Sequence, residues 1–368
     1  MLEKGKISVL QMGMMTYLMI GATAILIVPS ITAQKAGRDM WLSPVFSSLS
    51  GILAVWIAWK LYKLFPEESI IEASEKILGR TLGKILSFPF LFFLLHTYGT
   101  IAREYGEFVT AAYLYKTPIG VVMGFMILVC IFAVRGGIEV IARCTQIFLP
   151  MIILFSFVMI ILVLPDLNPY NMLPILESGL MPAIKGSISP HIWFIEFFYI
   201  SFLFPLLNRR KKVLRGGMVP VLTLMLTMVI SNLIGLFVLG DLTAKFNFPI
   251  YTVGKYISIA DFLQHLDAII LAIWIGGNFI QLSVWLYVLV LGTAQWLNLS
   301  DYRPIVFPLG FLSTLFSIWV VPNFQDLVLF FSTAVIPWAY ITLAVYPLFL
   351  LGVGTIQRRA KTKMPSTS

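Results

Sequence analysis

Long apolar runs separated by short polar connections form the dominant pattern along the 368 residues. About 20 helical residues cross the hydrocarbon core of a bilayer, and lipid leaves only helices and closed barrels as spanning structures. No stretch alternates apolar and polar residues as a barrel strand does. The pattern therefore predicts an all-α integral membrane protein with ten spans, at residues 8–29, 41–62, 85–112, 117–134, 144–164, 187–206, 217–240, 268–297, 304–321 and 326–355.

The connections between these spans are mostly short. The segment 64–84 has its acidic residues near its start, as the helix dipole favours, and it predicts a short amphipathic helix on the cytoplasmic side. The sizeable outer loops are about 165–186 and 241–267. Because no low-complexity segment or linker divides the chain, residues 1–368 are expected to form a single transmembrane domain.

The composition excludes a soluble protein. The chain is 59% hydrophobic and 12% charged, whereas soluble domains carry about 25% charged residues. Cys130 and Cys144 fall in or near spans and the three histidines are not clustered, so the sequence predicts neither a disulfide framework nor a metal site. The sequence has no nucleotide-binding loop and no nucleophile–base pair at a recognisable spacing. We therefore expect no enzymatic activity and no cofactor.

The net charge of +9 could indicate a nucleic-acid partner, so its distribution matters. If the N-terminus is cytoplasmic, 19 of the 26 Lys and Arg lie in inner connections and tails, six lie in outer loops, and Arg103 lies within a span. Positive residues concentrate on the cytoplasmic side of membrane proteins, so both termini are predicted to be cytoplasmic. The basic runs 208–212 and 358–363 are then topology signals, and no nucleic-acid partner is expected.

Two spans contain residues that weaken a helix. The first has Gly21 with small neighbours near mid-membrane and Pro29 after them, and the sixth has Pro190 early and Glu196 near its middle. In a helix interior Gly costs about 1 kcal/mol and Pro about 3 kcal/mol relative to Ala. These positions are five spans apart, so a repeated five-span unit would be inverted, and interrupted helices at matching positions point to a midplane binding site. The same residues could instead serve ordinary helix packing.

Glu196 is the only formally charged residue from Gly186 to Asn208. An ionisable residue inside the membrane is a candidate functional residue. Its carboxyl could pair with the ammonium of a ligand, carry a coupling proton, or switch a conformational equilibrium. The alternative is a structural role, as a neutral acid bonded to a neighbouring helix.

Other polar residues within spans also form pairs. Arg103 and Glu107 are four residues apart in the third span, so they share a helix face and can form an ion pair. Their place near the outer interface is consistent with a paired helix end or with an outer gate. In the eighth span, Asn278 and Gln281 lie one turn apart, where interhelical hydrogen bonds or a ligand would satisfy their amides.

Several motifs together carry a family resemblance. They are G-A-T-A-I-L-I-V-P (21–29), the Arg103 and Glu107 pair, Thr117-Pro118, Glu196 followed nine residues later by Pro205, Trp274-Ile275, the DYRP tetrad (301–304) and the basic C-terminal tail. With these motifs the chain resembles the B-subunit family of spore germinant receptors, a branch of the amino acid–polyamine–organocation superfamily with the LeuT-like fold.

The resemblance implies a fold, a location and partners. The fold would be a 5+5 inverted repeat with interrupted helices 1 and 6, its repeats at about 8–164 and 187–355, followed by a cytoplasmic tail at 356–368. The protein would lie among the lipids of the spore inner membrane. It would act with a larger A-type subunit and a lipoprotein C-type subunit to detect a germinant, an amino acid or a similar small nutrient.

By analogy with the superfamily, the ligand site would lie between spans 1, 3, 6 and 8. The residues carried over to it are Gly21, Ala22, Thr23, Tyr98, Thr100, Trp193, Phe194, Glu196 and Asn278. The chain departs from the family pattern at Ile195 and Thr23, where relatives often have Gly. These larger residues predict shorter unwound turns, or a smaller and more apolar pocket.

Three functions remain open at this point. The first is a nutrient-sensing receptor subunit that retains a transporter fold. The second is a proton-coupled amino acid transporter with Glu196 as its proton carrier. The third is a conduit for ions or water within the receptor complex.

Overall fold

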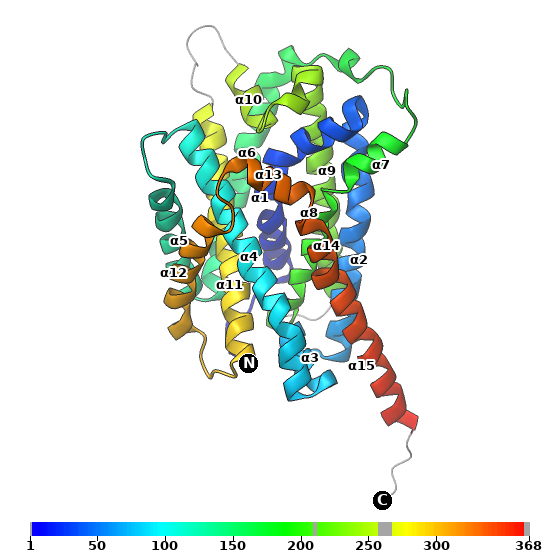
Figure 1. The fold of residues 1–368 in the computed structure, drawn as a ribbon, viewed down its shortest axis with the longest axis vertical. Helices are drawn as coiled ribbons and strands as arrows, with labels where there is room; N and C mark the ends of the chain where they lie inside the picture. The colour runs from blue at the N-terminus through cyan, green and yellow to red at the C-terminus, as the bar shows by residue number, and fades with distance from the viewer. Residues whose placement is uncertain (1, 209–211, 257–266, 364–368) are drawn as a thin grey trace, which may run out of the picture.

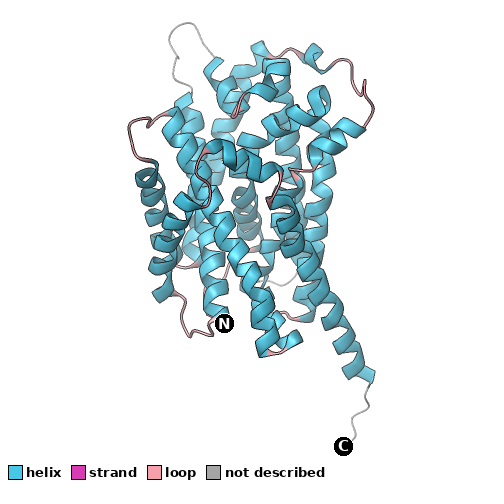
Figure 2. Ribbon diagram, viewed as in Figure 1, coloured by secondary structure: helices cyan, strands magenta, loops and turns pink. Residues whose placement is uncertain are grey.

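The computed structural model describes residues 2–208, 212–256 and 267–363, and helices dominate all three ranges (Figures 1 and 2). Within them, extended pairing is limited to one isolated bridge between Ile7 and Leu207. Three residues of the predicted basic run, 209–211, lie outside the described residues. The all-α fold predicted from the apolar runs is confirmed.

The first half of the chain supplies six α-helices and one 3₁₀-helix. They are α1 (Val9–Ala36), η1 (Gly37–Leu42), α2 (Ser43–Leu64), α3 (Ile70–Leu78), α4 (Arg80–Ala112), α5 (Ile119–Arg135) and α6 (Ile138–Val163). The predicted amphipathic segment 64–84 contains α3, which begins with a capping box at Ser69 and Glu72. Figure 1 shows α1 in the middle of the bundle, where it packs along α9 and α11.

The second half has more short elements. They are η2 (Leu164–Asp166), η3 (Pro169–Met172), α7 (Met181–Ser187), α8 (His191–Ile195), η4 (Glu196–Phe202), η5 (Phe204–Leu206), α9 (Val213–Leu239), η6 (Gly240–Lys245), α10 (Pro249–Tyr256), α11 (Asp267–Trp296), α12 (Arg303–Trp319), α13 (Phe324–Ser332), α14 (Val335–Tyr340), η7 (Ile341–Val345) and α15 (Tyr346–Lys363).

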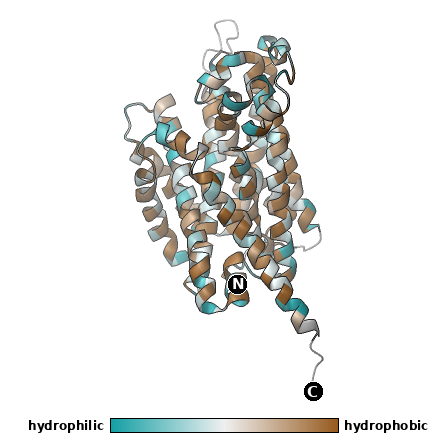
Figure 3. Cartoon of the chain, turned by 45° about the vertical axis from the view of Figure 1, so that its right-hand side comes forward, coloured by the Kyte–Doolittle hydropathy of each residue, from teal (hydrophilic) through white to brown (hydrophobic). Residues whose placement is uncertain are grey.

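Apolar helical segments match the predicted spans. Six stretches of the described residues are long and apolar enough to cross a membrane, and the first of them, Val9–Leu64, contains both α1 and α2. The remaining spans correspond to two shorter apolar helices, Ile119–Arg135 and His191–Phe202, and to α12 with its bent partner α13. Figure 3 shows hydrophobic residues along the length of the bundle and hydrophilic residues mainly toward its ends.

The predicted interruption of the first span is wrong. α1 is one continuous α-helix with Pro29 inside it. Gly21 serves packing instead, because a Cβ at this position would lie 3.3 Å from the side chain of Leu224 on α9. Tertiary packing of α1 against α9 and α11 stabilises a helix whose local propensities are weak.

The sixth span is interrupted, as predicted. It consists of α7, a turn after Ser187, the five-residue α8 and then the 3₁₀-helix η4, which begins at Glu196. A 3₁₀ run longer than three or four residues is uncommon and often marks a hinge or strain. Every residue of η4 is buried, so the break lies inside the bundle.

The last predicted span, 326–355, has different bounds. The axes of α12 and α13 differ by 97° across a break that contains Pro322, and the apolar stretch that follows is Val335–Ala360. α15 then continues to Lys363, so the predicted tail 356–368 begins within a helix. The side chain of Gln357 donates to the carbonyl of Ile77 at 2.9 Å, which ties this end of α15 to α3.

The N-terminal segment closes one end of the bundle. Ile7 pairs with the chain at the end of η5, since its N–H donates to the carbonyl of Leu206 at 3.0 Å. The buried carboxylate of Glu3 accepts from the hydroxyl of Tyr302, in the DYRP tetrad, at 2.8 Å, and from the N–H of Ile138 at 3.3 Å. Both ends of the described chain lie at this same end of the bundle (Figure 1).

Candidate functional site

Thr23 of α1 joins three helices at the centre of the bundle. Its side chain is 1% exposed, and its hydroxyl oxygen accepts from Trp193 Nε1 of α8 at 3.1 Å and from Gln281 Nε2 of α11 at 3.1 Å. Both donors would lose their partner without this oxygen. Spans 1, 6 and 8 therefore meet at one hydroxyl.

Other side chains of α11 donate to the backbone of α1. Trp274 Nε1 donates to the carbonyl of Ala22 at 2.8 Å, and Trp285 Nε1 donates to the carbonyl of Met19 at 3.2 Å. Gly277 allows this close approach, because a Cβ there would lie only 3.3 Å from the Cβ of Ala22. We call Ala22, Thr23, Trp193, Trp274, Asn278 and Gln281 the Thr23 cluster.

Asn278 lies on the same helix as the other α11 members, one turn from Gln281. Its Nδ2 donates to the carbonyl of Trp274 at 3.0 Å, whereas its Oδ1 is buried without a hydrogen-bond partner. The Oε1 of Gln281 also has none. Most buried polar atoms in proteins are paired, so unpaired acceptors at one site mark it as a candidate for binding a ligand or a water molecule.

The third span contributes aromatic rings and hydroxyls. Tyr105 stacks on Trp274 with ring centroids 5.9 Å apart, and Phe108 contacts the same indole edge-on at 4.1 Å. Tyr98 is fully buried with an unpaired hydroxyl, while the hydroxyl of Thr100 donates within its own helix to Thr97 at 2.8 Å. Tyr98 is thus available for a ligand contact, and Thr100 is already satisfied.

Glu104 is a buried acidic residue that the sequence pattern does not single out. It is fully buried in α4, and neither carboxyl oxygen has a hydrogen-bond partner. It interacts electrostatically with Glu196, which is 6% exposed at the junction of α8 and η4. In the sequence Glu104 stands beside Arg103 and looks like another possible ion-pair partner. A helix rotates by about 100° per residue, however, so Glu104 lies on a different face from Arg103 and Glu107.

The predicted pair of Arg103 and Glu107 is present. Arg103 donates to Glu107 Oε1 through Nε at 2.9 Å and through Nη2 at 2.6 Å. The same Nη2 donates to the carbonyl of Pro322 at 2.9 Å, in the break between α12 and α13. The pair therefore also ties α4 to the start of α13.

Two predicted site residues face elsewhere. Gly21 lies against Leu224 of α9, and Phe194 packs against Gly51 of α2, whose Cβ would lie 3.1 Å from its ring. Trp193 and Phe194 are neighbours on a short helix, so they lie on different faces of it. Trp193 reaches Thr23, and Phe194 therefore points away from Thr23, toward α2. The structure does not bring Gly21 or Phe194 to the Thr23 cluster.

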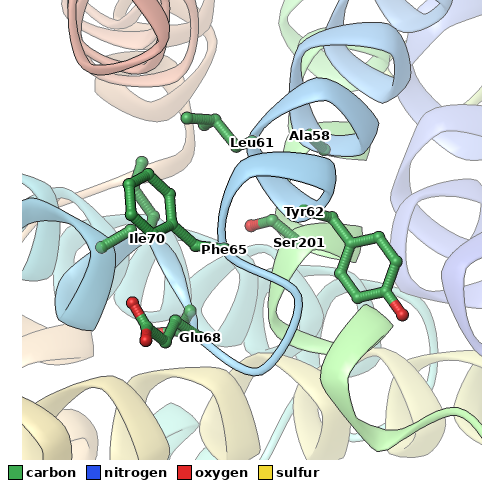
Figure 4. Close-up of a pocket in the computed structure, with 9 residues that line it drawn as sticks. Ala58, Leu61, Tyr62, Phe65, Glu68, Ile70 and Ser201 are labelled. Carbon is green, nitrogen blue, oxygen red and sulfur yellow. The ribbon is translucent and has the colours of Figure 1, made fainter. Parts of the chain in front are cut away.

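Two small cavities lie away from this cluster. One, of about 10 Å³, is lined by Leu61, Phe65, Glu68 and Ser201 among others (Figure 4), which is room for about one water molecule. The other, of about 20 Å³, is lined by residues that include Glu3, Glu67 and Glu72. Neither is lined by a member of the Thr23 cluster. Among the described residues, no three His, Cys, Asp or Glu side chains converge as a metal site.

Structural comparison shows the fold. The crystal structure titled "MhsT in complex with L-phenylalanine" superposes with a TM-score of 0.64, covering 94% of this chain and 88% of that one at 17% sequence identity. The fold is therefore the LeuT-like fold expected from the sequence.

Sequence comparison shows the family. Spore germination protein KB of Bacillus subtilis (strain 168) is 28% identical over 98% of each chain. Spore germination protein XB of Bacillus anthracis is 27% identical over 74% of this chain and 77% of its own. The sequence profile described as "Spore germination protein" matches residues 6–325. This chain therefore belongs to the spore germination protein family.

Proposed function

We propose that this protein is the B-type membrane subunit of a spore germinant receptor, and that it binds a small nutrient molecule at the Thr23 cluster. The observation that carries the proposal is the meeting of α1, α8 and α11 at Thr23, beside a break in the sixth span that begins at Glu196. Family membership and the transporter-like fold support this function over an enzymatic one.

The ligand class that we propose is an amino acid or a similar small nutrient. A ligand acts by binding one conformation better than another, and the interrupted sixth span supplies an element that can move. Tyr98 of α4 and Asn278 of α11 are the further contacts we assign to it, because each carries an unpaired polar atom. Ala22, Trp193 and Glu196 complete the proposed set, and Arg103 with Glu107 forms the proposed outer gate.

The proposed setting is the inner membrane of the spore, with both termini cytoplasmic. A larger A-type subunit and a lipoprotein C-type subunit are the proposed partners. The positive charges at inner connections support this orientation, and so does the position of both described chain ends at one end of the bundle.

The second candidate is a proton-coupled amino acid transporter. The observation that favours it is Glu196, a buried carboxyl without an ion-pair partner among the described residues. A conduit for ions or water is the third candidate, and the small cavity beside Ser201 is the feature that favours it.

One experiment separates the receptor from the transporter. Purified protein in proteoliposomes is given a panel of labelled amino acids, with and without a pH gradient. Saturable binding without accumulation supports the receptor, and gradient-driven accumulation supports the transporter.

Spores that carry Glu196→Gln at normal protein level should show an altered nutrient response. An unaltered response at normal level would contradict the proposed role of Glu196.

A further inference from the structure

The Thr23 cluster contains hydrogen-bond acceptors without a partner. The side-chain nitrogens of Trp193, Trp274, Asn278 and Gln281 each donate to a protein oxygen. The amide oxygens of Asn278 and Gln281 have no partner. A ligand that contacts these oxygens must therefore bring N–H or O–H donors of its own.

The nearby carboxyl groups add to this demand. Glu104 is fully buried with both oxygens unpaired, and it interacts electrostatically with Glu196. The hydroxyl of Tyr199, which is 1% exposed, is also unpaired and interacts with Glu196. Burying a carboxylate is costly unless it is compensated. Within the described ranges no ion pair includes Glu104 or Glu196, and Arg103 is already bound to Glu107.

The donors that a ligand carboxylate would need are lacking on α1. A carboxylate commonly binds at a helix N-terminus, where backbone N–H groups are free. α1 is continuous through Thr23, so its N–H groups there are occupied by the helix itself. Along the described part of α1, the site thus offers no free backbone N–H groups that could hold an anion.

We propose that Glu104 and Glu196 together bind one organic ammonium group, and that the site recognises its ligand by this cation without requiring a carboxylate. The inference rests on the proposed function and narrows it from amino acids in general to amine-bearing molecules. Because the Thr23 cluster is packed, binding must accompany an opening of the bundle around the break at Glu196.

The test uses the full-length protein in lipid nanodiscs and three probes with one carbon skeleton. L-alaninamide carries the ammonium alone, L-alanine carries both charges, and propionate carries the carboxylate alone. The thermal unfolding midpoint is titrated with each at constant ionic strength, with sodium and potassium chloride as further arms. We expect both amines to raise the midpoint with similar apparent Kd values, and propionate and the alkali salts to have no effect.

The variants locate the site. Glu104→Gln and Glu196→Gln should each weaken alaninamide binding by about 10- to 100-fold, the effect of losing a hydrogen bond to a charged group. Glu177→Gln, at an exposed position of the outer loop, should bind as the parent does. An unchanged midpoint without ligand shows that a variant is folded, and each of the two glutamates is an independent test.

Four results would overturn the inference. They are binding of alanine but not of alaninamide, an equal shift with alkali ions, the absence of any shift with either amine, and binding that depends on Glu196 but not on Glu104. In the first and last cases the proposed nutrient-binding function would stand, since saturable binding of an amino acid would remain.

Discussion

A single hydroxyl, that of Thr23, holds two buried donors from two different helices. Thr23→Val keeps the shape of the side chain and removes the acceptor. An unsatisfied buried donor costs about 1–3 kcal/mol, so we expect a loss of stability of this order for each donor. Thr23→Ser should stay near the parent. Thermal unfolding in detergent measures the difference, and equal midpoints for Val and Ser would remove Thr23 from its central role.

The ion pair of Arg103 and Glu107 gives a second prediction. Charge reversal at either position places like charges one turn apart in a mostly buried environment, and we expect each single variant to lose about 3 kcal/mol or more. Reversal at both restores the attraction. It cannot restore the bond to Pro322, because a carboxylate does not donate. The double variant should therefore recover part of the unfolding midpoint; no recovery would contradict the pairing.

At the scale of single residues, the sequence predicts which residue types lie near the centre of the bundle better than it predicts where each side chain points. Of the residues predicted for the ligand site, Thr23, Trp193 and Asn278 come together in the Thr23 cluster, whereas Gly21 and Phe194 face α9 and α2. The rotation of each helix about its axis decides this, and packing against neighbours sets that rotation. The sequence does not single out Glu104 for the same reason. The helix rotation turns it away from its neighbour Arg103, which pairs with Glu107 instead.

Among the elements, the first and sixth spans show where sequence signals fall short. Both carry Gly or Pro near mid-membrane, yet α1 is continuous and only the sixth span breaks. Propensity penalties of a few kcal/mol are small beside the packing of a central helix. The positions of the spans could be predicted from the apolar runs. The 97° bend between α12 and α13 could not, because a proline such as Pro322 indicates a break without fixing its angle.

The short helix α3 predicts a pH effect outside the bundle core. Burial raises the pKa of Glu72 above its ordinary value of 4.5, although the N–H of Ser69 opposes this. The folded protein then binds a proton that the unfolded chain has lost, so stability falls as pH rises from 4.5 through the folded pKa.

Glu72→Gln should remove this part of the pH dependence. Gln keeps an acceptor for the capping box but does not ionise. We expect the thermal unfolding midpoint of the variant to rise relative to that of the parent as pH increases from about 4 to about 7. This is the range above an ordinary carboxyl pKa. Thermal unfolding of both proteins across this range checks it. Parallel curves would show that Glu72 does not titrate differently on folding.

For the whole molecule, the charge distribution and the fold make one joint prediction about orientation. Ser178, in the loop before α7, and Thr81, at the start of α4, are both exposed. The loop before α7 and the start of α4 lie at opposite ends of the bundle (Figure 1). In a chain whose native cysteines are replaced, Ser178→Cys should react with a membrane-impermeant maleimide added to intact cells. Thr81→Cys should react only after lysis. The reverse pattern would invert the proposed topology.

The N-terminal segment around Glu3 and Ile7, finally, bears on the order in which the contacts of the bundle form. Tyr302 follows its partner Glu3 by 299 residues. While the helices insert one after another, Glu3 can bond to Ile138 early, yet it lacks the hydroxyl of Tyr302 until the DYRP tetrad has emerged. Chains truncated before Tyr302 should therefore leave the residues around Glu3 more open to protease than chains that include it. This segment is made long before the last of its contacts can form.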